Sequence, residues 1–397
     1  MISVGIDVSK GKSTVCILKP GGEVLQPPFE INHTADELES LVALIKSFDE
    51  EVRVVLEDTG HYHLPVVVPL VKRGIFVCCI NALRMKKFCS QSLRRAKTDK
   101  IDSIKIANFG LTYWNNLTPT LQNGEIYHEL KLLARQYYQT TSLLVKAKIN
   151  LSNLLDQTMP NIQTVLADNK SNSKLTDFVA RYYHYNHILK MGEQGFTTDY
   201  CAWAKEKGYR LNERKAAQIF ALAQNGIPTL PNSISTRIAV SEAVKLIQSI
   251  TESRNTILAQ MQEFCKSLPE YFIVKDMPCI GDTLASRIIA EIGDVRRFKN
   301  KHSLVAYAGI DAPPYQSGTF NASERHISKR GNSYLRKTAF EIMQSLIQHK
   351  PNGDPVYDFV QKKRSEGKSA KEAMVAGINK FLRVYYGKVM ELYSIAA

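Results

Sequence analysis

The chain has 397 residues, a formal net charge of +14 and a pI near 9.3. This length predicts two or three domains, because single domains usually run to roughly 100–200 residues. A content of 44% hydrophobic and 23% charged residues argues against wholesale disorder. The surplus of Lys and Arg favours a polyanionic partner, above all nucleic acid, although a basic protein without such a partner stays open.

The seven cysteines are odd in number and show no CxxC spacing, so we expect reduced core residues rather than a disulfide or zinc framework. The first residues lack the basic-then-apolar layout of a signal peptide, and no run of 18 apolar residues occurs. We therefore expect a cytoplasmic protein that does not enter a membrane.

The first 120 residues alternate short apolar runs with amphipathic stretches. β-Branched runs predict strands over residues 2–8, 13–18, about 24–31, 52–56 and 75–80. Helical spacing of apolar residues predicts helices over 34–48, over a stretch that contains Pro65 and Pro69, and from about 98 to 114. Thr34 and Glu37 fit a capping box at the start of the first helix. The order βββαβαβ predicts an α/β domain that ends near residue 120.

The rest of the chain has mainly helical patterns. Two long amphipathic helices are predicted over residues 125–157 and 234–268, and we expect them to pair as a coiled coil. Residues 160–233 between them predict a mostly helical insertion. Further helices are predicted up to Ile292 and around 333–349, 355–366 and 370–385. The predicted domains are 1–120, 121–268 and a mainly α domain over 269–397.

Four carboxylates stand where predicted strands end and a predicted helix begins. Asp7 closes the first strand and Glu57 the fourth, while Asp99 and Asp102 are three residues apart on one helical face. Four such charges would repel one another unless a divalent cation neutralised them, and Mg²⁺ or Mn²⁺ is the natural occupant. This pattern predicts metal-assisted phosphoryl transfer. The alternative is that Asp99 and Asp102 cap a helix and Asp7 is a turn residue.

Basic residues precede the acidic pair, and we expect Arg94, Arg95 and Lys97 to contact phosphates, with a solvated basic face as the alternative. Further along, the sequence from Pro278 to Gly281 before a helix fits a helix-hairpin-helix. There the backbone N–H groups near Gly281 would bind a phosphate; an ordinary turn is the alternative.

Ser317 lies before Gly318 in a segment that leads into a dense cationic element. An exposed nucleophile is one interpretation of this serine, and a simple turn is the other. The candidate phosphate-binding cations that follow are Lys329, Arg330, Arg336 and Lys337.

The ordered set of short motifs resembles the DEDD transposases of bacterial insertion sequences, a family that includes bridge-RNA-guided recombinases and is similar to the Piv site-specific DNA invertases. The resemblance covers about residues 1–120 and 235–350. Its motifs are Gly5-Ile6-Asp7-Val8-Ser9-Lys10, Leu56-Glu57-Asp58-Thr59-Gly60, Lys97-Thr98-Asp99-Lys100-Ile101-Asp102 and His326-Ile327-Ser328-Lys329-Arg330-Gly331-Asn332.

This resemblance implies an RNase H-like, RuvC-like first domain whose acidic tetrad is Asp7, Glu57, Asp99 and Asp102. It also implies a C-terminal transposase domain whose serine attacks DNA, and the matching position is Ser317. The chain has Ser317-Gly318-Thr319 where the family has Ser-Gly-Gly, so Ser323 and Ser328 stay possible substitutes. The central region is longer than in compact relatives. DNA, a structured guide RNA and a homo-oligomer from dimer to tetramer are the implied partners.

Two other functions stay open from the sequence. A metal-dependent nuclease that resolves branched DNA with activated water would use the same RuvC-like site. A nucleic-acid-binding protein without catalysis would keep the basic charge but break no phosphodiester. A Piv-type invertase is the alternative within the resemblance.

Overall fold

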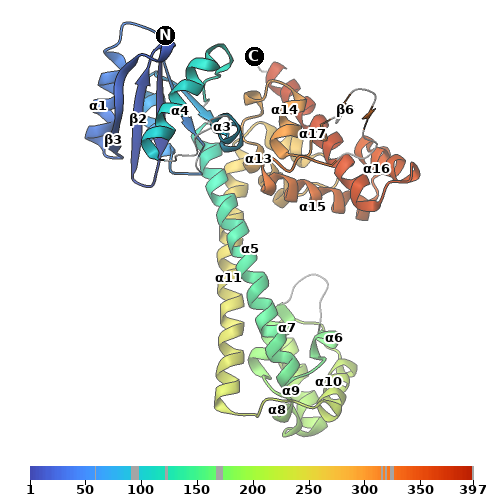
Figure 1. The fold of residues 1–397 in the computed structure, drawn as a ribbon. Coiled ribbons are helices and arrows are strands. Elements are labelled where there is room, and N and C mark those ends of the chain that lie inside the picture. Colours follow the sequence, from blue (N-terminus) through green and yellow to red (C-terminus); the bar gives the residue numbers. More distant parts are fainter. Residues whose placement is uncertain are drawn as a thin grey trace. The chain divides into compact units, whose positions relative to one another are not determined.

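The computed structural model describes residues 1–58, 60–90, 98–120, 124–166, 173–313, 316–317, 320–321 and 326–395. It divides into two compact units, Met1–Gln122 and Asn123–Ala397. Figure 1 shows both units. The predicted further division of the second unit at residue 268 stays a prediction.

A five-stranded mixed sheet forms the centre of the first unit, in the order β3-β2-β1-β4-β5. The strands β1, β2 and β3 are antiparallel neighbours, whereas β1, β4 and β5 are parallel. Parallel neighbours need crossover connections, which the helices between them supply. The strands are β1 (Ile2–Val8), β2 (Lys12–Leu18), β3 (Val24–Asn32), β4 (Val52–Glu57) and β5 (Phe76–Ile80).

Helices cover both faces of this sheet, which is why its central strands are almost wholly apolar. One face packs on α1 and α2, with Leu41, Val42 and Val67 in its core. The other face packs on α4. The helices are α1 (Ala35–Lys46), α2 (Leu64–Lys72), α3 (Ala82–Cys89) and α4 (Asp99–Thr112), with 3₁₀ turns at Pro20–Gly22 and Trp114–Asn116. The predicted order βββαβαβ is confirmed.

The predicted capping box at α1 is wrong in its bonding. Thr34 is the N-cap residue by position, but its side chain accepts no capping hydrogen bond. Glu37 instead accepts hydrogen bonds from the backbone N–H and the side-chain amide of Asn32, at 2.6 and 2.7 Å. The carboxylate therefore ties the helix to the end of β3, because that strand brings two donors within its reach.

Two long helices, α5 (Glu125–Thr158) and α11 (Ile234–Lys266), run side by side in the second unit. They are antiparallel, since Leu130 at the start of α5 shares a core with Met261 near the end of α11. At the other end, Leu151 shares a second core with Val240. The predicted helix pair is therefore present, while the coiled-coil packing itself stays a prediction.

The segment between these two helices folds as a small helical bundle, as predicted. Its core is unusually aromatic, with Phe178, Tyr200 and Trp203 packed edge to face and tilted. The helices are α6 (Ile162–Leu166), α7 (Ser173–Arg181), α8 (Tyr185–Leu189), α9 (Gly192–Glu206) and α10 (Glu213–Asn225).

The last part of the chain is a helical bundle around Ile288, Leu304, Ile342 and Leu382. Its helices are α12 (Glu270–Lys275), α13 (Asp282–Ile292), α14 (Lys301–Ala308), α15 (Ser333–His349), α16 (Pro355–Ser365) and α17 (Ala370–Ile395), with a 3₁₀ turn at Val295–Arg297 and the short strands β6 (Gln316–Ser317) and β7 (Phe320–Asn321). Among the described residues, no helix is long and apolar enough to span a membrane.

The last helix corrects the sequence prediction, which ended it at Tyr385. It continues to Ile395 because Val389 is buried in the bundle and the Tyr393 hydroxyl donates a hydrogen bond to Glu270 at 2.7 Å. The short helix α12, which carries Glu270, had not been predicted.

Candidate active site

Asp7 and Glu57 occupy the same edge of the sheet. The parallel pairing of β1 with β4 sets Ile6 opposite Leu56, so the next residue of each strand is an acid. Residues one position beyond a matched pair of parallel neighbours are again matched, about 4.8 Å apart between strands. The two carboxylates therefore stand side by side where β1 and β4 end, and both residues are half-buried.

Two glycines bring α4 directly against β1. A Cβ atom on Gly5 would lie 2.2 Å from the Ala107 nitrogen and 2.3 Å from the Ser103 oxygen, so only glycine permits this approach. A Cβ atom on Gly110 would likewise lie 2.1 Å from the Ser3 hydroxyl. Residues later in β1 therefore contact residues earlier in α4, so the helix lies antiparallel to the strand.

This packing carries the start of α4 to the end of β1. Ser3, Gly5 and Asp7 share one face of the sheet, because side chains alternate along a strand. Two residues of strand advance about as far as four or five residues of helix. One further step beyond Ser103 and Ala107 reaches the first turn of α4, where Asp99 and Asp102 lie. The fold thus brings all four predicted acids to one edge.

The first turn of α4 is capped by a different residue. The Thr98 side chain accepts a hydrogen bond from the Ile101 backbone N–H at 3.2 Å. Neither acid is the N-cap residue, although both lie in the first turn of the helix. Asp102 is half-buried beside the Lys105 ammonium, 3.6 Å from it, while Asp99 is exposed.

The pKa of the Cys89 thiol is affected by the charged side chains at this edge. Burial is the main cause that raises the pKa of its thiol. Lys105 opposes the shift, whereas Asp102, Glu57 and Asp7 add to it. One side chain at the end of α3 is therefore close to carboxylates from β1, β4 and α4. Cys89 was not predicted at the site, since no local sequence pattern marks where the end of α3 lies.

Carboxylate oxygens are the donors that Mg²⁺ and Mn²⁺ prefer, and in this respect the four acids fit such an ion. Within the described ranges, however, no three Asp, Glu, His or Cys side chains are grouped closely enough to hold a metal ion. The backbone thus places the acids at one edge of the sheet, but their side chains are not grouped around one metal-sized position.

The structure describes only part of the basic segment that precedes α4. Arg84 of α3 lies 5.2 Å from the ring centres of Phe109 and Tyr113, in a cation–π arrangement. Arg94, Arg95 and Lys97 fall outside the described residues, so their phosphate-binding role stays a prediction.

Ser317 belongs to a short hairpin rather than to an irregular loop. Ser317 of β6 pairs with Phe320 of β7, and Gln316 pairs with Asn321, in antiparallel register. The side chain of Ser317 and the whole of Ser323 are outside the described residues. Ser328 is engaged locally, because its hydroxyl donates to Asp311 at 2.5 Å and accepts from the Arg330 N–H at 3.3 Å.

The two segments that flank the hairpin are bonded to each other. The Ser328 N–H donates to the Asp311 oxygen and the Lys329 N–H to the Gly309 oxygen, both at 2.9 Å. The Asn332 N–H donates to the Tyr307 oxygen at 2.7 Å. Residues 307–311 and 328–332 thereby form a base for the hairpin.

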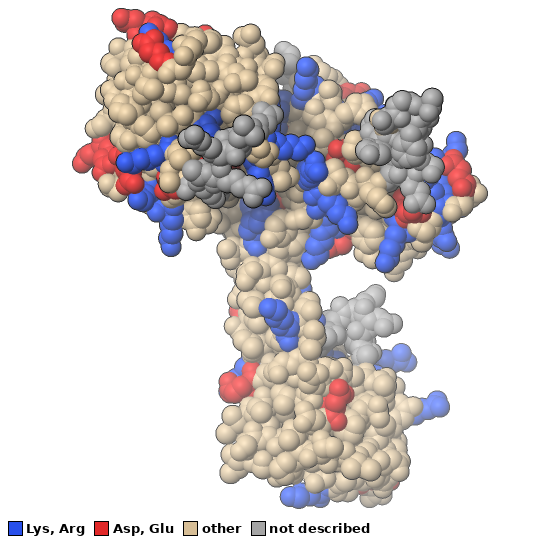
Figure 2. Space-filling model, in the orientation of Figure 1, with Lys and Arg blue, Asp and Glu red and all other residues tan. Residues whose placement is uncertain are grey.

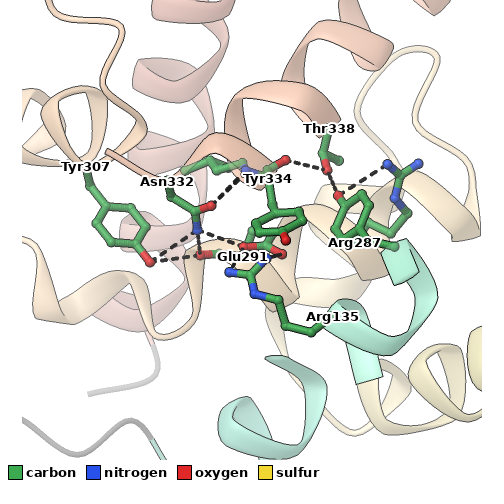
Figure 3. Close-up of polar contacts among 9 residues, drawn as sticks. Arg135, Arg287, Glu291, Tyr307, Asn332, Tyr334 and Thr338 are labelled. Atoms are coloured by element: carbon green, nitrogen blue, oxygen red, sulfur yellow. Dashed lines mark hydrogen bonds and ion pairs between the residues drawn. The ribbon is translucent and has the colours of Figure 1, made fainter. Parts of the chain in front are cut away.

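A buried carboxylate anchors this base, as Figure 3 shows. The Glu291 side chain has no exposed surface and accepts hydrogen bonds from Arg135 at 2.7 and 3.1 Å. It also accepts from the Asn332 amide at 2.7 Å, while the Asn332 oxygen caps α15 by accepting from Tyr334 and Leu335. Sequence inspection missed this group, because Arg135 and Glu291 are 156 residues apart.

The predicted cations around the base differ in their surroundings. Lys329, Arg330 and Lys337 are exposed. Arg336 is half-buried and donates to the carbonyl oxygens of Ala308 and Gly331 at 2.8 and 3.1 Å, so it holds the base together. Figure 2 shows Lys and Arg side chains over this C-terminal bundle, with fewer over the α6–α10 bundle.

Gly281 is the N-cap residue of α13, and α12 precedes it after a short turn. Asp282 follows at the first helical position, where its carboxylate accepts from the Tyr271 hydroxyl and pairs with Lys275, both at 2.7 Å. The two helices and their turn are present, and phosphate binding at Gly281 stays a prediction.

The first unit thus has the mixed sheet order β3-β2-β1-β4-β5 of an RNase H-like α/β domain, with two acids at adjacent strand ends. Residues 4–160 match a family model described as transposase, of the DEDD type. Residues 272–358 match a second model, described as transposase of the IS116/IS110/IS902 family. The two matches together span more than half of the chain, which belongs to this transposase family.

Individual proteins and one solved structure are similar to parts or most of this chain. The IS116 uncharacterized 44.8 kDa protein of Streptomyces clavuligerus is 22% identical over 94% of this chain and 91% of its own length. The IS110 uncharacterized 43.6 kDa protein of Streptomyces coelicolor is 23% identical over 76% of this chain and 73% of its own. The pilin gene-inverting protein of Moraxella bovis is 25% identical over 30% of this chain and 36% of its own. The solved RuvC of Thermus thermophilus covers 30% of this chain and 100% of its own, with 13% identity and a TM-score of 0.25.

Proposed function

We propose that the protein cuts and rejoins DNA at the ends of an insertion sequence and at its target, using the four acids of the first unit and Ser317 of the second. The observation that carries this proposal is the convergence of Asp7, Glu57 and the first turn of α4 on one sheet edge. Membership of the transposase family supplies the DNA substrate class.

The acids are proposed to hold a divalent cation. Asp7, Glu57, Asp99 and Asp102 carry four negative charges at one edge, and Mg²⁺ or Mn²⁺ bound there would offset their repulsion. When bound, the ion would supply positive charge for the phosphoryl oxygens of the reacting phosphodiester. Lys105, which already pairs with Asp102, limits the repulsion when the ion is absent.

Ser317 is proposed as the attacking group. Its Oγ forms a bond to the phosphorus, the bond from phosphorus to one deoxyribose oxygen breaks, and the serine proton passes to solvent while that oxygen leaves as a hydroxyl. Attack by a hydroxyl of another strand then reverses these changes and frees the serine. One phosphodiester is lost and one gained, so no external energy source is required. The hydrogen-bonded base at residues 307–311 and 328–332 supports this proposal, because it offers a fixed attachment for the segment that carries the serine.

A covalent adduct separates this mechanism from its alternatives. Full-length protein with Mg²⁺ and labelled element-end DNA should give a protein–DNA adduct that is stable in denaturant. Ser317→Ala should abolish the adduct, whereas the matched controls Ser323→Ala and Ser328→Ala should retain it. Nicked DNA without any adduct would contradict serine attack and support the water-using nuclease, and intact DNA under all metals would support simple binding.

The metal site has its own test. Asp102→Asn should lower cleavage by at least about 100-fold, since it removes one ligand charge from the proposed site. Asp156→Asn, a matched charge change on α5, should leave cleavage within twofold of the unchanged protein. Full cleavage by an Asp99→Asn, Asp102→Asn double variant in Mg²⁺ would refute the proposed role of the tetrad.

A guide RNA and an oligomer complete the proposal. Exchange of four strands needs several copies of the site, so we expect a dimer to tetramer, which light scattering of the DNA complex would measure. Structured RNA that copurifies with the protein and derives from the DNA beside its gene would support guidance. Sequence-specific cutting by RNA-free protein would contradict it.

A further inference from the structure

A cavity of about 720 Å³ lies in the C-terminal bundle, against α17 and beside the base of the hairpin. Its floor is apolar, formed by Ile327, Val375 and Ala376, and Phe359 of α16 contributes a half-buried aromatic ring. The volume falls in the usual range for small-ligand sites, roughly 300–1,000 Å³. An apolar floor of this size in a basic bundle is unexplained by the proposed chemistry.

Four cations stand around this floor. Lys371, Lys380 and Arg383 come from α17 and Lys368 from the segment before it. Among the described residues, none of the four has a carboxylate within ion-pair distance, in contrast to Lys275, Arg287 and Lys363 of the same bundle. Glu372, the described acid on the lining, accepts a hydrogen bond from the Ser369 N–H at 3.0 Å. The positive charge is therefore available to a ligand.

The cavity lies against the two chain segments that lead into and out of the hairpin that carries Ser317. Ala312 and His326, which lie on either side of that hairpin in sequence, both line it. A second hollow of about 410 Å³ shares Ile310, Ile327 and Val375 with the first and extends to Arg336 and Lys337. The two hollows are therefore adjacent at the base of the hairpin, and together they are called the groove.

We propose that this groove binds an unpaired DNA strand beside the phosphodiester that is cut, with one base in the apolar cavity and its flanking phosphates on the cations. The proposal deepens the function proposed above and rests on it for the choice of DNA. The negative phosphates of a strand would pair with the cations of α17. A base can stack on an aromatic ring whatever its identity, so this contact needs no particular sequence. A duplex would present phosphates only, and would leave the apolar floor without a partner.

The first test measures binding without cutting, with purified full-length protein, a labelled 12-nucleotide single strand of mixed sequence and the matching duplex. Ala376→Phe fills the cavity without changing charge, and should weaken single-strand binding at least tenfold while duplex binding stays within twofold. Each phosphate contact contributes about 0.7 to the slope of log affinity against log salt on a single strand. Lys380→Ala with Arg383→Ala removes two such contacts and should therefore make this slope shallower by about 1.4.

A matched control lies on the same helix. Lys388 is exposed on α17 and lines a different hollow, so Lys388→Ala removes one positive charge outside the groove, half of that lost in the double variant, and should leave single-strand affinity within twofold. Unchanged single-strand binding by folded Ala376→Phe would overturn the proposal. Equal losses for single strand and duplex would overturn it as well, because they would indicate a general phosphate surface.

Crosslinking of the unaltered protein keeps the proposal testable if Ala376→Phe does not fold. A single strand that carries 4-thiothymidine should crosslink within residues 359–383, and crosslinks confined to other segments would overturn the proposal. Tenfold tighter binding of RNA with the same sequence, lost in Ala376→Phe, would assign the groove to RNA instead. The adduct assay on Ser317→Ala stays independent, so either proposal can fail while the other stands.

Discussion

Gly5 offers the most direct test of how the acidic edge is assembled. Replacing it with alanine adds a Cβ atom 2.2 Å from the Ala107 nitrogen and 2.3 Å from the Ser103 oxygen. Both atoms are backbone, so no side chain can rotate away. The helix α4 must retreat from β1 by roughly 1 Å before ordinary contact distances return, and overpacking of this kind usually costs about 1–3 kcal/mol.

The retreat should affect chemistry more than folding. Asp99 and Asp102 travel with α4, whereas Asp7 and Glu57 stay with the sheet. A misplacement of about 1 Å at a reacting site can lower the rate by about 100-fold. We therefore expect Gly5→Ala to unfold at lower denaturant concentration, and to cut DNA about 100 times more slowly under conditions in which circular dichroism shows it folded.

Gly387 provides the matched control for this substitution. It lies in α17, and a Cβ atom added there meets nothing within 4 Å. Gly387→Ala should therefore stabilise the helix by up to about 1 kcal/mol and leave cutting unchanged. Wild-type stability and cutting rate in Gly5→Ala would refute the view that the close approach of α4 to β1 sets the geometry of the acids.

Three further substitutions test the local structure of each unit. Thr98→Ala should destabilise the first unit by about 1 kcal/mol, because it removes the side-chain cap of α4, and urea denaturation followed by circular dichroism checks this. Glu291→Gln should lower adduct formation while single-strand binding stays within twofold. The amide can still accept a hydrogen bond from Asn332, but it cannot neutralise Arg135. Equal losses of adduct formation and single-strand binding would contradict a role of Glu291 in placing the hairpin. Lys275 and Tyr271 lower the pKa of the Asp282 carboxyl. The ionised carboxylate therefore stabilises the fold fully at a pH above the usual aspartate pKa, and this stabilisation is lost as the pH falls through the lowered pKa of the folded state. Denaturation curves from pH 6 to 2 should show a smaller acid-induced loss of stability in Asp282→Asn than in the unaltered protein.

The sequence predicted the first unit well, because its signals are local. Alternating and helical periods mark the strands and helices, and the acids follow directly from where β1 and β4 end. The end of α17 was missed because Gly387 resembles a helix stop, while the burial of Val389 and the bond from Tyr393 to Glu270 outweigh it. Contacts of that kind depend on residues far away in sequence, which no local pattern encodes.

The candidate site divides in the same way. The acids and Ser317 stand in recognisable motifs, whereas the groups that position them do not. Cys89 is close to the acids only because α3 ends near that edge of the sheet. The groove beside the hairpin is assembled from α16, α17 and the two segments at the base of the hairpin, so its apolar floor is invisible until these elements are packed together.

The anchoring of the hairpin base follows from the energetics of a buried charge. Glu291 has no exposed surface, so it would be costly without a cation and further donors. Arg135 neutralises it, and Asn332 uses it to fix the end of the base and the start of α15 at once. Because Arg135 lies on α5, this ion pair ties the base of the hairpin to the long helix pair.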